Sequence, residues 1–146
     1  MGINIRTKGQ SGERQVQKIL NDIIAEVRED LGYPAHDVID LPFQRNQNQS
    51  AVGGADLSNP MNLEIEVKRQ EALSVNSWWK QCILSAARTG GIPILIYRQN
   101  RKPWKIMMNG NINVKGGYYF DTRVEISIAA FKEWFRIYYK WWLQDA

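Results

Sequence analysis

The chain has 146 residues, of which 44% are hydrophobic and 23% are charged, and its formal net charge at pH 7 is +4. This balance of apolar and charged residues excludes a disordered chain, and the length is that of one ordinary domain, so we expect residues 1–146 to form a single domain. The mild positive charge suits a polyanionic partner without requiring one.

Nothing in the sequence predicts secretion or a membrane span. Residues 1–10 are polar and basic, and no apolar run approaches the ~20 residues that a spanning helix needs. The single cysteine, Cys82, excludes a disulfide within the chain and fits a reducing compartment. We therefore expect a cytoplasmic location, in a bacterium or an infected host cell.

The first predicted element is an amphipathic helix. Apolar residues recur at steps of three and four, at Val16, Leu20, Ile23, Val27 and Leu31. The residues 11–13 precede this pattern, and Gly32 ends it. Glu13 lies three residues before Val16, on the same inward face. A carboxylate on an apolar face is unusual unless it faces a site.

The middle of the chain predicts short strands around a polar loop. Residues 38–43 alternate weakly and predict a strand, whereas 44–55, rich in Asn, Gln and Gly, predict a loop. Residues 56–57 suggest a short strand. Residues 63–68 form a clear strand, in which Glu66 and Lys68 share one face with Glu64.

The second half predicts a helix, three strands and a final helix. Ser74 or Ser77 caps a helix that runs to about Arg88, and the apolar residues 92–97 predict a central strand. Residues 104–108 predict a strand, 109–111 a turn, 118–120 an edge strand, and 128–142 an amphipathic helix. The order predicts an α/β fold with a mixed central sheet flanked by helices.

One group of residues carries chemistry. Period two places Glu66 and Lys68 side by side, and a hairpin after the Gly-rich turn would bring Asp56 beside Glu66. Two carboxylates suit Mg²⁺, which lowers the pKa of a bound water and neutralises charge on a phosphate. Lys68 could orient that water, the carbonyl of Val67 could add a metal ligand, and Glu13 could complete the site.

The same residues allow a simpler interpretation. Alternating Glu and Lys on a strand is also typical of a solvated face, and an E-x-K triplet occurs by chance in many proteins. From the residues alone, a nuclease site and a solvated strand remain equal alternatives.

The motif order resembles the PD-(D/E)XK nuclease superfamily, and within it the archaeal-type Holliday-junction resolvases and their phage relatives. The matching residues, over about 8–97, are Gly9 with Glu13 (G-x-x-x-E), Ser50, then Gly54-Ala55-Asp56 and Ile65-Glu66-Val67-Lys68. The chain departs from the pattern at Ala55, where proline is usual.

The resemblance implies a restriction-endonuclease-like core with a catalytic set in which Glu13, Asp56 and Glu66 bind metal and Lys68 is the catalytic lysine. It also implies that Gln81, on the helix after the lysine strand, looks into the site, although a plain surface glutamine fits equally. The cofactor would be Mg²⁺, with Mn²⁺ as a substitute. Resolvases act as homodimers that nick opposed strands of a four-way junction during DNA recombination.

Candidate DNA contacts flank the predicted site. The resemblance places Lys8 and the loop from Arg45 to Ser50 near the DNA backbone, to which Arg, Asn, Gln and Ser can donate. The expected set is Lys8, Arg45, Asn46, Gln47, Ser50 and Lys80. On the C-terminal helix, Trp134 and Trp141 lie outside the main apolar face and suggest a dimer surface, unless the first helix buries them.

These features lead to one function with two alternatives. We expect a Mg²⁺-dependent, structure-selective DNA endonuclease from a phage or similar mobile genome, specifically a Holliday-junction resolvase. The first alternative is a nuclease of the same superfamily that acts on flap, single-stranded or duplex DNA. The second is a non-catalytic DNA-binding module on the same fold.

Overall fold

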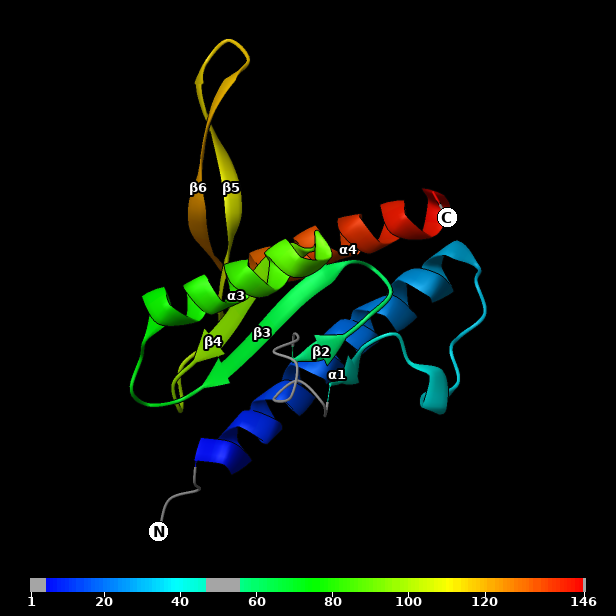
Figure 1. The fold of residues 1–146 in the computed structure, drawn as a ribbon. Coiled ribbons are helices and arrows are strands. Elements are labelled where there is room, and N and C mark those ends of the chain that lie inside the picture. Colours follow the sequence, from blue (N-terminus) through cyan, green and yellow to red (C-terminus); the bar gives the residue numbers. More distant parts are fainter. Residues whose placement is uncertain (1–4, 47–55, 146) are drawn as a thin grey trace.

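The computed structural model describes residues 5–46 and 56–145 (Figure 1). The elements are α1 (Ile5–Leu31), η1 (Val38–Asp40), β1 (Gln44–Arg45), β2 (Leu57–Ser58), β3 (Leu63–Arg69), α3 (Val75–Thr89), β4 (Ile92–Arg98), β5 (Lys105–Lys115), β6 (Tyr118–Ser127) and α4 (Ile128–Asp145). The six strands form one sheet in the order β1-β2-β3-β4-β5-β6, in which β3 and β4 are parallel and the other neighbours antiparallel. The predicted α/β fold with a mixed central sheet is confirmed.

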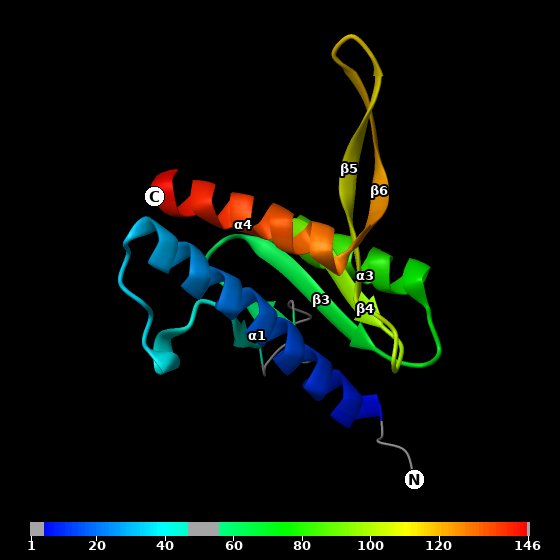
Figure 2. The ribbon, with the colours of Figure 1, turned by 180° about the vertical axis from the view of Figure 1, so that it is seen from behind.

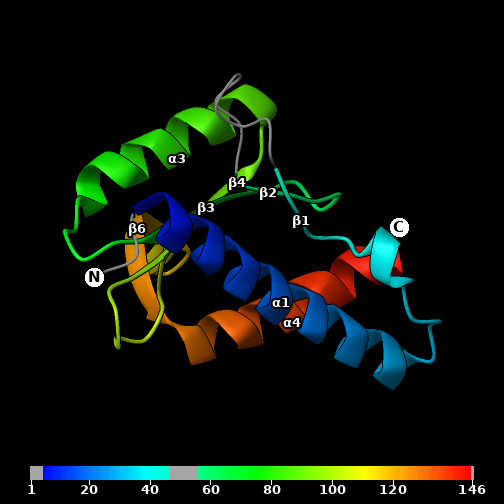
Figure 3. The same ribbon diagram turned by 90° about the horizontal axis from the view of Figure 1, so that it is seen from below.

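Helices cover both faces of the sheet. Seen from below, α1 and α4 lie together on one side and α3 lies on the other (Figure 3). The main core fills the α1–α4 side, and a smaller cluster of Trp78, Leu95, Tyr97 and Met107 lies under α3. No helix in the described ranges is long and apolar enough to cross a membrane.

Helix α1 begins at Ile5, earlier than the sequence predicted, and ends as predicted before Gly32, whose φ is +79°. Gly12 therefore lies inside the helix. A Cβ at Gly12 would lie 3.2 Å from the Cβ of Arg69, so α1 approaches β3 closely at this point. This contact places Glu13, the next residue, on the α1 side of the sheet.

The parallel pair β3–β4 fixes which side chains share a face. Ile65 and Val67 point into the main core, so Glu66 and Lys68 point to the face that α3 covers. Glu66 is registered with Leu95, and Lys68 with Tyr97. The predicted strand at 63–68 and the central strand at 92–97 are both confirmed, each one residue longer.

Three local predictions are wrong. Residues 38–43 form a 3₁₀ helix and an extended segment instead of a strand, because Asn21 of α1 bonds the backbone N–H and carbonyl of Phe43 and anchors the chain there. Gln44 and Arg45, at the start of the loop predicted at 44–55, instead form strand β1, and 47–55 lie outside the described residues. Residues 109–111 do not turn, and β5 continues to Lys115.

Glycine explains the last of these errors. A Cβ at Gly110 would lie 2.8 Å from Val124, so glycine serves here for close packing between two strands rather than for a turn. The turn lies at Gly116 and Gly117, with φ of +36° and +93°. The predicted edge strand at 118–120 therefore extends to Ser127.

The C-terminal helix α4 follows its predicted apolar face, with Phe131 and Phe135 fully buried. Tyr139 is also fully buried, although the sequence pattern did not select it. Trp134 stacks on Phe131 and packs against the core, so it does not form the predicted surface pair with Trp141, which is 64% exposed.

Candidate metal centre

The main chain of Asp56 is fixed between two strands. Its N–H donates to the carbonyl of Ile65 at 2.9 Å, and its carbonyl accepts the N–H of Asn46 at 2.9 Å. The side chain is buried, and Oδ2 accepts the N–H of Val67 at 2.6 Å. The backbone pairing that the predicted hairpin required is therefore present, and it sets Asp56 against β3.

Glu66 lies buried beside Asp56, with only 3% of the residue exposed. Burial, the neighbouring negative charge of Asp56 and a hydrogen bond with Asp56 together raise the pKa of Glu66 to about 8, and Lys68 opposes the shift. In the protein without a cation, this carboxyl therefore holds its proton at neutral pH.

Two further groups converge on the pair. Lys68 is half-buried on the same strand face as Glu66 and close enough to lower its pKa. The N–H and C=O of one strand residue point to the same strand edge, so the carbonyl of Val67 points, like its N–H, toward the side of Asp56. The structure thus brings residues 56, 66, 67 and 68 together.

Glu13 stands apart from this group. It is buried, and its Oε1 lies 3.1 Å from Nε of Arg45 in an ion pair. Within 5–46 and 56–145, no three His, Cys, Asp or Glu side chains are close enough together to hold a metal ion. The structure therefore gives a pair of carboxylates, with the helix glutamate held by an arginine.

The two carboxylates fit a divalent cation. Mg²⁺ takes hard oxygen ligands and usually binds one or two carboxylates while it keeps several waters. Two buried carboxyls that share one proton hold a negative charge that a cation would compensate. Asp56, Glu66 and the carbonyl of Val67 would hold such an ion, and the geometry leaves Glu13 to Arg45.

The predicted outer residues lie in different surroundings. Gln81 is exposed on α3, beside the buried Cys82. Lys80 is exposed on the same helix, and Lys8 is half-buried with Nζ 3.7 Å from Glu71. Arg45 is half-buried and pairs with Glu13 rather than pointing into solvent. Gln47 and Ser50 lie outside the described residues.

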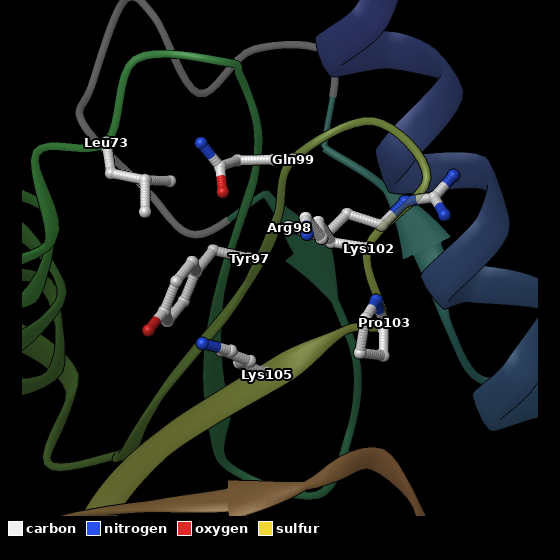
Figure 4. A pocket seen from close by; sticks show the side chains of 7 residues that line it. All are labelled: Leu73, Tyr97, Arg98, Gln99, Lys102, Pro103 and Lys105. Atoms are coloured by element: carbon white, nitrogen blue, oxygen red, sulfur yellow. The ribbon is translucent and has the colours of Figure 1, made fainter.

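Sequence reasoning missed a pocket next to the site. Its volume is about 240 Å³, and it is lined by Leu73, Tyr97, Arg98, Gln99, Lys102, Pro103 and Lys105 (Figure 4). Tyr97 and Lys105 reach into the same side of it, and the hydroxyl of Tyr97 donates to Glu125. Arg98 turns toward α1, where it donates to Gln15 at 2.8 Å.

Strand register ties this pocket to Lys68. Lys68 is registered with Tyr97, and Tyr97 with Lys105, so the three side chains form a row across one face of the sheet. The sequence contained Lys105 but not the pairing that places it in this row. The alternation of residues within 104–108 could have assigned Lys105 to a face of the sheet only if the neighbouring strand had been known.

A mixed sheet with helices on both faces, carrying an aspartate and an E-x-K strand at one buried point, defines the PD-(D/E)XK nuclease class. The chain belongs to the family described as "Phage putative PDDEXK endonuclease", whose profile matches residues 4–143. Nucleases of this superfamily generally use divalent metals. The chain matches no curated protein and no solved structure.

Proposed function

We propose that the protein is a Mg²⁺-dependent endodeoxyribonuclease whose centre comprises Asp56, Glu66 and Lys68, with Mn²⁺ as a substitute ion. The observation that carries the proposal is the buried pair of Asp56 and Glu66, with Lys68 on the same strand face. Burying two carboxylates close together destabilises the folded protein, and a bound divalent cation would compensate their charge.

Each residue has a distinct role in this proposal. A bound Mg²⁺ would lower the pKa of a water and offset charge on the phosphate. Asp56 and Glu66 hold the ion, and the N–H of Val67 orients the Asp56 carboxylate through its 2.6 Å bond. Lys68 orients the attacking water and offsets the charge that develops on the scissile phosphate. In this proposal Arg45 positions Glu13 through their ion pair and is not a primary DNA contact.

Lys68 and Lys105, on either side of the buried Tyr97, support a path for the DNA strand. Neighbouring strands lie about 4.8 Å apart, so the row spans about 10 Å across two spacings. That distance is enough for the two lysines to meet neighbouring phosphates of one DNA strand. The pocket beside Lys102 and Lys105 would hold a phosphate next to the one that is cut.

The finer specificity rests on the resemblance of the motifs. We propose a branched substrate, the four-way junction, cut on opposed strands by a homodimer acting in phage DNA recombination. Because each chain carries one centre, paired nicks on opposed strands require two copies. A nuclease that acts on flap, single-stranded or duplex DNA needs only one copy.

The decisive experiment compares labelled four-way junction, flap and linear duplex DNA with Mg²⁺, Mn²⁺ or EDTA. We expect metal-dependent cleavage of the junction by the wild type and loss of cleavage in Asp56→Asn, Glu66→Gln and Lys68→Ala, each with DNA binding largely kept. Full cleavage by Glu66→Gln would contradict the assigned mechanism. Equal cleavage of all three substrates would favour the simpler nuclease.

A second candidate is a non-catalytic DNA-binding module. The observation that favours it is the separation of Glu13 from the other two carboxylates, since Glu13 pairs with Arg45. Tight DNA binding with no cleavage of any substrate in either metal would establish this alternative. The retained Asp56, Glu66 and Lys68 set argues against it, because a site without a function could lose its buried charges.

A further inference from the structure

The β5–β6 hairpin extends beyond the body of the protein. Figures 1 and 2 show it rising past all three helices, with only its base against the sheet. The ten registered pairs run from Lys105–Ser127 at the base to Lys115–Tyr118 at the tip. A two-stranded ribbon is at best marginally stable alone in water, so the outer half of this hairpin lacks the packing that such a ribbon needs.

One face of the hairpin is mainly apolar, interrupted by the Gly110–Thr122 pair in the middle and by Lys115 at the tip. At the base, Ile106 is registered with Ile126 and Met108 with Val124, and Ile106, Met108 and Ile126 join the main core. Strand parity carries the same face outward to Ile112, which is registered with Phe120. The core surface thus continues into a stretch that nothing in the described structure covers.

The outer part of this face, which we call the arm face, comprises Ile112, Tyr118 and Phe120. Their exposed fractions are 51%, 76% and 59%. Val114, in the bulge at the tip, is 68% exposed. Three neighbouring large apolar side chains left in water mark an interaction surface rather than ordinary surface variation.

The opposite face of the same hairpin is polar. Its outer positions are Asn109, Asn111 and Asn113 on β5, with Arg123, Asp121 and the exposed Tyr119 on β6, so polar residues outnumber the aromatic one. A solvated hairpin with no partner would have no reason to separate its residues in this way. The separation therefore implies that the arm face, and not the polar face, is buried in the functional assembly.

We propose that the arm face packs against the same face of a second copy of this chain, related by a two-fold axis. Apart from Lys115, which is registered with Tyr118 at the tip, the face carries no lysine, arginine or acidic residue, so it offers little to DNA phosphates, whose binding depends on cations. A mainly apolar face is complementary to itself, as an interface between identical copies requires.

The size of the arm face agrees with such an interface. At the exposed fractions given, these side chains and Val114 offer on the order of 500 Å² per copy, or about 1,000 Å² for two copies. That area is near the lower limit for a specific contact, so the dimer should dissociate on dilution. The arm-face dimer rests on the proposed dimeric nuclease for its biological role. Its physical basis, the exposed apolar face, does not depend on that function.

Sedimentation velocity over a concentration series tests the interface with a matched pair of variants. Phe120→Ser removes an aromatic side chain from the arm face, and Tyr119→Ser removes its neighbour, which is 58% exposed on the opposite face. We expect the wild type and Tyr119→Ser to dimerise and Phe120→Ser to shift the dimer dissociation constant upward at least tenfold. A monomeric wild type, or equal shifts in the two variants, would overturn the inference.

A shortened hairpin guards against misfolding of a point variant. Asn109 and Arg123 are registered partners, so 110–122 can be replaced by a two-residue Asn-Gly turn. We expect this protein to be monomeric, to keep Mg²⁺-dependent nicking of single strands of a junction, and to lose paired nicking of opposed strands. A shortened protein that still dimerises would overturn the proposal that the arm face forms the dimer interface.

The two proposals fail differently. A wild type that cuts DNA but stays monomeric at every concentration would refute the arm-face interface and would leave the proposed nuclease activity standing. A wild type that dimerises through the arm but cuts no DNA refutes the nuclease and leaves the interface intact.

Discussion

The main-chain N–H of Val67 donates to Oδ2 of Asp56 at 2.6 Å, a bond that ties the aspartate to the centre of the E-x-K strand. It links residues eleven positions apart in the chain and sets the aspartate beside Glu66. The raised pKa of Glu66 is one consequence of this contact, and it makes the metal-free site sensitive to pH.

Glu66 should make the metal-free protein less stable as pH rises. Its pKa is about 8 in the folded protein against an ordinary 4.5, so between these values the folded state holds a proton that the unfolded state has released. The free energy of unfolding should therefore fall across this window, by a few kcal/mol at about 1.4 kcal/mol per pKa unit.

Urea unfolding in EDTA at pH 5.5 and 8.5 would measure this effect. We expect the stability of Glu66→Gln, which cannot ionise, to exceed that of the wild type by a larger margin at pH 8.5 than at pH 5.5. A Glu66→Gln protein less stable than the wild type at pH 8.5 would contradict a buried, protonated Glu66.

Cation binding should release a proton. Glu66 must ionise to hold Mg²⁺, so binding below pH 8 displaces its proton, and affinity should rise roughly tenfold per pH unit up to about pH 8. Calorimetry in two buffers of different ionisation enthalpy would count the protons. Glu66→Gln serves as the control and should bind weakly with no release. Equal wild-type affinity at pH 6.5 and 8.5 would refute this linkage.

Lys105 should contribute one phosphate contact. It lies in the row that starts at Lys68, on the face opposite α4. Lys105→Ala should weaken DNA binding for all sequences and lower the slope of log affinity against log salt by about 1. Lys140→Ala, which removes an exposed lysine from α4, should change neither quantity. Equal effects of the two variants would show that only overall charge matters.

Gly12 should be required for the approach of α1 to β3. In Gly12→Ala, the new Cβ would lie 3.2 Å from the Cβ of Arg69, so we expect destabilisation of about 1–2 kcal/mol and weaker cleavage. Gly9→Ala is a matched control in the same helix, since nothing lies within 4 Å of its Cβ position. It should be neutral or stabilising by up to about 1 kcal/mol. Thermal unfolding of both variants would decide, and similar melting temperatures would contradict the close contact.

Local pattern predicted most of the regular structure because each element carries its own periodicity. The spacing of Val16, Leu20 and Ile23 predicted α1, and the alternation around Glu66 predicted β3. The hairpin was mistaken because Gly110, a turn signal by composition, instead accommodates Val124 of the neighbouring strand. That requirement depends on a residue fourteen positions away, which no local window contains.

For the site, the sequence by itself determined the residue types and the parity of Glu66 and Lys68, since a strand has a period of two whatever surrounds it. Only the tertiary structure decided the rest. It set Asp56 against Val67, paired Glu13 with Arg45, and aligned Lys105 with Lys68 through two strand registers. Such relations depend on which strands become neighbours, and that choice is made by burial of the whole core rather than by any segment of the chain.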